Sequence, residues 1–206
     1  MSRFKITNQE IESVDLGLTS KIAAYNLGST SPEDPGGYYA WGELTAKERY
    51  IKNNYRWYLK DNEQITKYGC EGDCANSDNV FRTVLDLEDD VAQKLLGGTW
   101  RTPSYNDIVE WHEKCIWKWE SYKGVKGYLL TSKVDGYTDR SVFLPAAGIM
   151  LDTILLNEGY AGYYWASSVY NQNNTKALAS VFDRNIIIRC LPNVRYAGLS
   201  IRPVCD

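Results

Sequence analysis

The sequence lacks several features that catalytic, membrane-bound and secreted chains usually carry. Its 206 residues include one histidine, His112, which leaves no plausible Ser/His/Asp set, and no glycine-rich phosphate-binding loop is present. No apolar run approaches the ~20 residues that a membrane-spanning helix needs. Residues 1–7 carry no apolar segment of a secretory signal. We therefore expect a protein that leaves the cell another way, as a virion part does, or one whose leader has been removed.

The chain also lacks a strong net charge and an even number of cysteines. The net charge is −3, which argues against a nucleic-acid or anionic-membrane partner. Five cysteines make an odd number, which fits no closed disulfide framework. Cys70 and Cys74 form the one close pair, and we favour a structural loop pair or two free thiols over a metal site, because zinc needs further Cys or His ligands nearby. We predict no metal, no cofactor and no insertion into a membrane.

The sequence does contain the material for a hydrophobic core. With 44% hydrophobic and 13% aromatic residues, the chain can bury enough area for a domain of its own, and we expect a single domain over residues 1–206. Residues 44–80 are polar and show no clear period, so we expect a surface excursion that is pinned by Tyr55, Trp57 and Tyr58. No internal repeat or low-complexity tract interrupts the chain.

Two short helices are expected in the middle of the chain. The first spans 91–96, between a capping-box pattern at 86–89 and a stop at Gly97. We interpret the acids before it as carboxylates that complement the helix dipole rather than as calcium ligands, because no glycine-centred calcium loop is present. The second helix begins at Ser104, and we expect its His112 to be a solvated or capping residue.

Strands are expected on both sides of these helices. The stretches 14–18 and 22–27 predict a hairpin, and the aromatic run 38–42 predicts a buried strand or a packed loop. Apolar patterns after the second helix predict antiparallel strands, and the final third is expected to be β from about residue 162 onward. The fold class is therefore predicted to be α+β. The later strands are expected at 116–119, 128–131 and 141–144, with a turn at 124–127 and a loop at 148–162.

One stretch resembles a known family. Residues 97–111 read Gly-Gly-Thr-Trp-Arg-Thr-Pro-Ser-Tyr-Asn-Asp-Ile-Val-Glu-Trp, which is similar to the Gly-Gly-x-Trp-Arg-x-Pro-Thr-x-x-Glu segment of the Fibrobacter succinogenes major paralogous domain, a family abundant in gut Bacteroidetes. The chain departs from many relatives at 20–24, where it lacks a tryptophan. Further short matches keep the family's order at 14–18, 39–43, 87–90, 143–148, 164–168 and 200–204.

The resemblance implies a C-type lectin-like fold, in which two helices pack on a twisted antiparallel sheet with long loops and ligands bind on the last strands. Formylglycine-generating enzymes and the variable proteins of diversity-generating retroelements resemble the same fold, so it fixes no activity. A catalytic domain of the first kind needs a reactive cysteine pair in the last third, where only Cys190 and Cys205 stand. Calcium-dependent sugar binding needs a Glu-Pro-Asn or Gln-Pro-Asp triplet and a Trp-Asn-Asp triplet, and neither occurs.

Residues 185–197 form a window whose side chains follow no core pattern. Strand alternation predicts that Ile187 points inward and that Ile186 and Ile188 point outward, which would expose an apolar patch. Every residue in the window can be reached by changing the two adenines of an AAC codon, as adenine-directed mutagenesis in a diversity-generating retroelement would leave behind. The alternative is a drifted loop whose isoleucines are covered by residues 44–80.

We therefore expect a non-enzymatic protein that displays a diversified surface over residues 160–204 and binds a protein or glycan receptor, on a virion or a cell surface, as a monomer or a homo-oligomer. The alternatives are a formylglycine-generating-enzyme-like domain and a static cell-surface domain that binds carbohydrate or protein. We expect Trp41, Trp100 and Trp165 to form the frame and Arg202 to pair internally. With no catalytic residue, the expected ligand-binding residues are Tyr163, Tyr164, Tyr170, Asn171, Asn173, Asn174, Arg184, Ile186, Ile188, Arg189, Cys190, Leu191, Asn193 and Tyr196.

Overall fold

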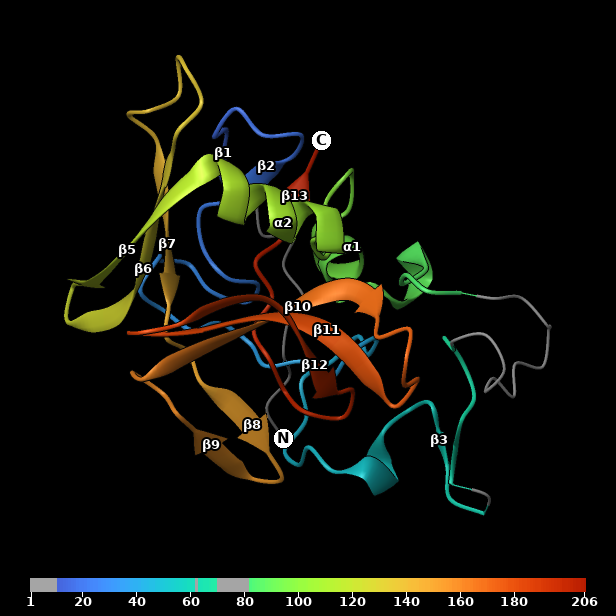
Figure 1. Ribbon diagram of the computed structural model, residues 1–206. Coiled ribbons are helices and arrows are strands. Elements are labelled where there is room, and N and C mark those ends of the chain that lie inside the picture. Colours follow the sequence, from blue (N-terminus) through green and yellow to red (C-terminus); the bar gives the residue numbers. More distant parts are fainter. Residues whose placement is uncertain (1–10, 62, 70–81) are drawn as a thin grey trace.

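A computed structural model describes residues 11–61, 63–69 and 82–206. The described part combines two short helices with mostly antiparallel strands, which confirms the α+β class (Figure 1). The helices are α1, Val91–Leu96, and α2, Tyr105–Lys114, with 3₁₀ turns at Lys52–Asn54 and Leu87–Asp89. None of the helices described is both long and apolar enough to cross a membrane.

The strands of the described residues pair into several small antiparallel sheets. Three sheets have three strands, and two are hairpins. The three-stranded sheets are β1 (Ser13–Val14), β2 (Lys21–Ala23) and β13 (Val204–Cys205); β5 (Cys115–Tyr122), β6 (Val125–Ser132) and β7 (Ser141–Pro145); and β10 (Ala161–Val169), β11 (Lys176–Asp183) and β12 (Ile187–Val194). The hairpins are β3 (Tyr58–Leu59) with β4 (Gln64–Ile65), and β8 (Ile149–Leu151) with β9 (Ile154–Leu156). The β1–β2 pair confirms the predicted early hairpin, and β13 joins this hairpin to the end of the chain.

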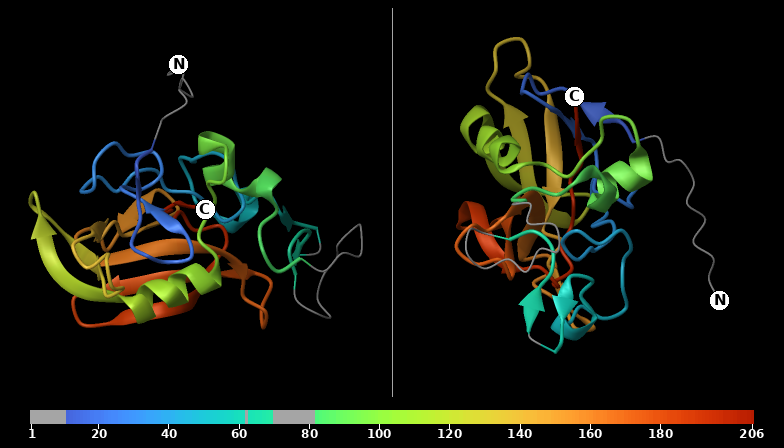
Figure 2. Two further views of the ribbon diagram at one scale, coloured as in Figure 1. Left: turned by 90° about the horizontal axis from the view of Figure 1, so that it is seen from above. Right: turned by 90° about the vertical axis from the view of Figure 1, so that its right-hand side faces the viewer.

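Helix α2 begins where the sequence predicts. The Asp107 N–H donates to Ser104 Oγ at 3.2 Å, and the Ser104 N–H donates to Asp107 Oδ2 at 2.6 Å, which closes a capping box. Ile108 and Trp111 are buried in one cluster with residues of β6, β7 and β10. α2 packs against β5, β10 and β12, and Figure 2 shows it lying along one side of the β10–β12 sheet.

The start of α1 differs from the prediction. Asp90 caps this helix, not Asp86, and its Oδ1 accepts the Ala92 N–H at 2.9 Å. Asp89 is buried and lies 2.5 Å from Lys67 Nζ and 3.1 Å from an Arg56 nitrogen. Of the acids before the helix, Asp90 therefore bonds the helix N-terminus as expected, whereas the carboxylates at 86–89 pair with cations of the excursion.

The turn between β5 and β6 lies earlier than predicted. Lys123 and Gly124 have φ angles of 46° and 87°, the conformation that a two-residue type I′ turn requires. Gly127, which we expected in the turn, lies inside β6 opposite Pro145. A Cβ atom there would lie 2.2 Å from the carbonyl oxygen of Leu144, so this glycine permits β7 to pack closely.

Residues 148–162 contain the β8–β9 hairpin, where the sequence predicted a loop. Asp152 occupies its turn with a φ of 54°, and its carboxylate accepts hydrogen bonds from Arg49 at 2.7 and 3.0 Å. Ile154 and Leu156 of β9 are exposed. Because apolar side chains occupy both faces of this hairpin, the alternation that marks a half-buried strand is missing from its sequence.

The β10–β12 sheet lies at the centre of the molecule between two buried clusters (Figure 1). Trp165 and Val181 face one cluster, whereas Tyr164 and Phe182 face the other. Trp41 also lies in the first cluster, and its Nε1–H donates to the Ala166 carbonyl at 2.8 Å. Trp41 and Trp165 are thus buried parts of the frame, while Trp100 is only half-buried.

Arg202 is fully buried and confirms the expected internal pairing. Its guanidinium donates to Asn26 Oδ1 at 2.9 Å, to the Ala23 carbonyl at 3.1 Å and to the Phe143 carbonyl at 2.6 Å. These three acceptors come from separate parts of the chain, so one side chain ties the first strands, β7 and the C-terminal segment together.

The run 38–42 is a packed loop with a single β-bridge, between Tyr39 and Leu199. The described part of the excursion closes over this loop. Tyr55 is buried and donates its hydroxyl to the Trp41 carbonyl at 2.8 Å, and Trp57 is half-buried. Cys70 and Cys74, with the rest of 70–80, lie outside the described residues, so the prediction for this cysteine pair stays a prediction.

Candidate binding surface

β12 is an edge strand of the β10–β12 sheet and carries five of the fourteen expected ligand-binding residues: Ile188, Arg189, Cys190, Leu191 and Asn193. One row of neighbours runs across the sheet from Tyr163 through Val181 to Ile188. A second row joins Ala179 to Leu191 on the same face. These pairings put the side chains of Tyr163, Ile188 and Leu191 on one side of the sheet.

The isoleucine orientations are as predicted. Ile187 pairs with Phe182 and packs against the cluster that contains Tyr164. Ile186 and Ile188 are 55% and 36% exposed, and Leu191 is 37% exposed. These exposures show that the described part of the excursion does not seal them from solvent. We call the side chains of Ile186, Ile188, Arg189 and Leu191 the β12 surface.

A β-bulge shapes this surface. Between the paired residues, β11 advances two positions, from Ala179 to Val181, while β12 advances three, from Leu191 back to Ile188. The extra residue falls at Arg189 and Cys190. Arg189 is exposed, whereas Cys190 packs partly against the core, and burial raises the pKa of its thiol to about 11. Cys190 is therefore less available for contact than we expected.

The turn before β12 presents Ile186. Asp183 Oδ1 accepts the N–H groups of Asn185 at 2.7 Å and Ile186 at 2.9 Å, which is the local bonding that favours aspartate before a turn. Arg184 is exposed in the same turn. At this end of the sheet, the apolar side chain of Ile186 and the cationic side chain of Arg184 are both exposed to solvent. The Asp183 carboxylate holds the backbone of the turn.

Arg189 links the β12 surface to α2. One of its guanidinium nitrogens lies 3.4 Å from Glu113 Oε1, and both side chains are more than half exposed. Such an exposed pair contributes little to stability, about 1 kcal/mol or less. Both groups are accordingly free to exchange this contact for one with a ligand.

Tyr164 is wrongly predicted as a contact residue. Its side chain is 0% exposed, its hydroxyl donates to the Pro145 carbonyl at 2.7 Å, and its ring stacks on Phe182 at 5.7 Å. Burial raises the pKa of Tyr164 to about 12. Adjacent strand residues face opposite sides, so the half-buried Tyr163 can belong to the surface only because Tyr164 belongs to the core.

The loop at Tyr170–Asn174 is not brought next to the turn at Arg184–Ile186. Val169 pairs with Ala177 at one end of the sheet, and Ala161 pairs with Asp183 at the other. With about 3.3 Å per residue, the two ends lie roughly 25 Å apart. The expected residues therefore form two groups, and Tyr170, Asn171, Asn173 and Asn174 lie at the end of the sheet where Asn193 pairs with Ala177.

This second group is held mainly by its own hydrogen bonds. Asn173 Oδ1 accepts from the Thr175 N–H at 2.9 Å and from its hydroxyl at 2.6 Å, and Tyr170 bonds to Gln172. Asn171 and Asn173 are exposed. Tyr196, in contrast, is half-buried beside Tyr50, Tyr55 and Ile65, so its main contacts are within the chain.

Sequence reasoning missed Arg195, which lies in the window but is not a surface residue. It is fully buried, donates to the carbonyls of Lys67 and Tyr68, and stacks on Trp41 at 4.6 Å. The window is therefore structurally divided: its exposed side chains lie at or before Leu191, residues 192–194 are half-buried, and Arg195 is a buried anchor. Asn193 is thus less available for contact than we expected, because its Nδ2 atom is buried. The sequence around Arg195 does not indicate whether this arginine is a surface residue or a buried anchor, because its neighbours are apolar in either case.

Two other groups of side chains matter for the metal-binding and catalytic alternatives. Asp86, Glu88 and Asp89 place carboxylate oxygens close together, and Lys67 Nζ sits among them at 3.0, 3.0 and 2.5 Å. The lysine ammonium thus serves as the counter-charge for this group. Cys190 and Cys205 lie on β12 and β13, which belong to different sheets.

Comparisons with known proteins add no relative to this description. No protein-family model, no curated protein and no solved structure matches this chain.

Proposed function

We propose that this chain is a non-enzymatic binding protein that uses the β12 surface to contact a protein or glycan receptor. The observation that carries this proposal is the exposure of Ile186, Ile188 and Leu191 while Ile187 packs inward. Exposed aliphatic side chains clustered on an edge strand favour association, so a monomeric protein seldom keeps them without a contact role.

The scaffold behind the surface suits such a role. Trp165, Phe182 and Arg202 are nearly or completely buried and are hydrogen bonded or packed on both sides of the sheet. A surface on a fixed sheet loses little conformational entropy when it binds, which favours affinity. Arg184, Arg189 and Tyr163 supply the cationic and aromatic groups that often anchor interfaces.

We further propose that the fold is C-type lectin-like and that the exposed part of 185–197 is diversified, as in the variable proteins of retroelements. The order of family-like segments over residues 14–204 and the AAC-accessible residues of the window support this. A virion tip or a cell surface is the location that such a surface would need. The DNA test is direct: a near-copy of the codons for 160–204 should lie beside a reverse-transcriptase gene, and flanking DNA with neither would leave an ordinary static site.

Replacing Ile186, Ile188, Arg189 and Leu191 together with serine tests the binding role. We expect loss of binding to intact bacterial cells and to a printed glycan array, wherever the unchanged protein gives a signal, because the exposed anchors are gone. The free energy of unfolding should fall by about 1 kcal/mol or less per position, since much of each side chain is already exposed. Urea denaturation measures this second quantity.

Ile187→Ser is the matched control, because this isoleucine lies between two of the replaced ones but faces the core. It should cost more stability than Ile188→Ser and should leave binding intact while the protein stays folded. Binding that survives the fourfold change would place the contact site elsewhere. A collapse in stability of the fourfold variant would show that these side chains belong to the core.

A further inference from the structure

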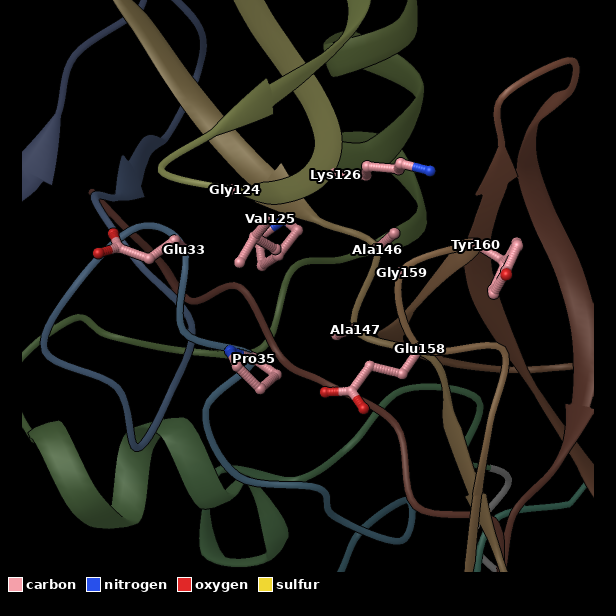
Figure 3. A pocket seen from close by; sticks show the side chains of 11 residues that line it. Glu33, Pro35, Gly124, Val125, Lys126, Ala146, Ala147, Glu158, Gly159 and Tyr160 are labelled. Atoms are coloured by element: carbon pink, nitrogen blue, oxygen red, sulfur yellow. The ribbon is translucent and has the colours of Figure 1, made fainter.

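A hollow of about 310 Å³ lies away from the β12 surface, between the β5–β6 turn, the 31–37 loop and the turn at Asn157–Tyr160 (Figure 3). Its size is at the lower end of the roughly 300–1,000 Å³ that small-molecule sites occupy. Pro35, Val125 and Ala147 are among its apolar lining residues. None of the residues expected to bind a ligand from the sequence lines it.

The walls of the hollow are fixed by hydrogen bonds. The Gly159 N–H donates to the Ala146 carbonyl at 2.7 Å, and the Ala146 N–H donates to the Lys126 carbonyl at 2.8 Å. The Tyr38 hydroxyl donates to the Ala147 carbonyl at 2.5 Å, and Asn26 Nδ2 donates to the Pro35 carbonyl at 2.9 Å. Each wall is thus tied to a neighbouring segment, which makes the hollow a preformed feature.

Among the charged residues that line the hollow, Glu158 and Lys126 form no ion pair in the part of the chain that the structure describes. Glu33 is paired with Lys123 at 2.9 Å, and Figure 3 shows its carboxylate turned away from the hollow. Lys126 extends to the far side, where its Nζ lies 5.9 Å from the Tyr160 ring centre. Glu158 forms no ion pair within the described residues, and its side chain extends toward Pro35.

The Glu158 charge also acts on Tyr38, whose hydroxyl holds the carbonyl of the lining residue Ala147. Burial raises the pKa of the Tyr38 hydroxyl, and the negative charge of Glu158 raises it further. An anion placed beside the Glu158 carboxylate would be repelled, and a purely apolar ligand would cover this carboxylate without satisfying it. A cation with an aliphatic stem satisfies both the walls and the carboxylate.

We propose that this hollow binds an alkylammonium group, which is either the side chain of a lysine in a peptide or a free primary amine. The methylene stem lies against Pro35, Val125 and Ala147, and the ammonium donates to the Glu158 carboxylate. This site is independent of the β12 surface, because the two share no residue.

Methyl NMR titrations test the proposal with n-pentylamine and with Nα-acetyl-lysine methylamide as probes, and n-pentanol as the neutral match. We expect saturable shifts of the Val125, Ala146 and Ala147 methyl signals, with a Kd in about the millimolar range for so small a ligand. The unchanged protein should bind n-pentanol about fivefold more weakly than n-pentylamine, and the Glu158→Gln variant should bind the amines about fivefold more weakly than the unchanged protein. Fivefold is about the contribution of one exposed ion pair. Added salt should weaken it as well.

Glu48→Gln is the control, because it removes the charge of another exposed glutamate that does not line the hollow. Binding of both amines identifies the lysine side chain as an accepted ligand, and binding of n-pentylamine alone identifies a free amine. The absence of saturable shifts with either amine would overturn the proposal, as would equal binding of n-pentanol or of the amines by Glu158→Gln. The fourfold serine variant of β12 should keep this site, so failure here and failure of the proposed function are told apart.

Discussion

His112 lies near the end of α2 in surroundings that disfavour its charged form. Its ring stacks on Trp117 at 4.6 Å, and within the described residues its buried Nε2 has no hydrogen-bond partner. Burial lowers the pKa of His112 to about 4, and the nearby charge of Arg189 adds to this. The prediction of a solvated or capping histidine was therefore wrong, because the sequence neighbours Glu113 and Lys114 do not reveal that Trp117 folds back onto the ring.

We expect stability to fall as pH drops from about 6.5 toward 4. The unfolded chain takes up a proton on His112 near its ordinary pKa of 6.5, whereas the folded chain resists it until about 4. This difference corresponds to about 3 kcal/mol of unfolding free energy, or about 2 kcal/mol once solvent screening of the partly exposed ring is allowed for; it is present above pH 6.5 and lost as the pH falls through 4. Urea denaturation of the unchanged protein and of His112→Phe, between pH 7 and 4.5, measures it.

His112→Phe keeps an aromatic ring against Trp117 and removes the titration, so its stability should change less over this pH range. Carboxylates contribute to both proteins at the acid end, and only the difference between the two curves reports on the histidine. Parallel curves would contradict the assignment of this pH dependence to His112.

Tyr163 and Tyr164 show what could be predicted about single residues. The sequence identified an exposed edge at this dipeptide, but strand alternation allows only one of the two rings to face outward. Which one depends on the register that pairs Tyr163 with Val181 and Tyr164 with Ser180. The outward positions on β12 were predictable because Ile187 could be aligned with the core, whereas β10 offered no comparable anchor.

At the scale of elements, Asp107 connects α2 to two other parts of the chain. Its carboxylate accepts from Ser104, from Arg101 at 2.7 and 3.2 Å and from the Ser20 hydroxyl at 3.0 Å. Burial acts to raise the pKa of Asp107, but the hydrogen bonds from Arg101 and Ser104 outweigh it and leave the pKa lowered. Asp107 thus closes the capping box and also joins the β1–β2 hairpin to the helix, as Glu110 does through Thr19.

We expect Asp107→Ala to lower the free energy of unfolding by about 3 kcal/mol, because it removes the carboxylate that bonds Arg101 most closely and half of the capping box. Ser104→Ala removes the cap hydroxyl alone and should cost about 1 kcal/mol. Asp135→Ala, an exposed turn position, should stay within about 0.5 kcal/mol. Urea denaturation followed by tryptophan fluorescence distinguishes them, and equal losses for Asp107→Ala and Ser104→Ala would show that the link to Arg101 and Ser20 adds nothing.

Elements with strong local signals were predicted well, and those fixed by tertiary contacts were not. The start of α2 follows from Pro103, Ser104 and Asp107, whose bonding is local. The β8–β9 hairpin depends on packing against other segments and on Asp152 in a left-handed conformation that Arg49 holds. No local pattern encodes those partners, so the sequence indicated a loop there.

At the scale of the whole molecule, Arg195 joins the binding segment to the excursion. Its guanidinium meets the Lys67 and Tyr68 carbonyls, while Lys67 pairs with Asp89 and the Tyr68 hydroxyl donates to the same carboxylate at 2.6 Å. The end of β12 is therefore fixed through a chain of contacts that reaches the start of α1. This arrangement separates positions that hold the fold from positions that face solvent within one short window.

A library that randomises positions 186, 187, 188, 191 and 195, sorted for folded protein by surface display, should show this division. Position 195 should return arginine almost exclusively, because its loss leaves the buried Tyr68 carbonyl and the partly buried Lys67 carbonyl without their donor, at a cost of about 1 to 3 kcal/mol for a buried group. Position 187 should return apolar residues, since its side chain packs beside Phe182. Positions 186, 188 and 191 should accept most residues, because a large part of each side chain meets solvent.

Sequencing before and after sorting gives the enrichment at each position. Arginine lost freely at 195, or strict selection at 186 and 188 without any ligand present, would contradict the division, and with it the physical basis for treating the exposed positions as free to diversify.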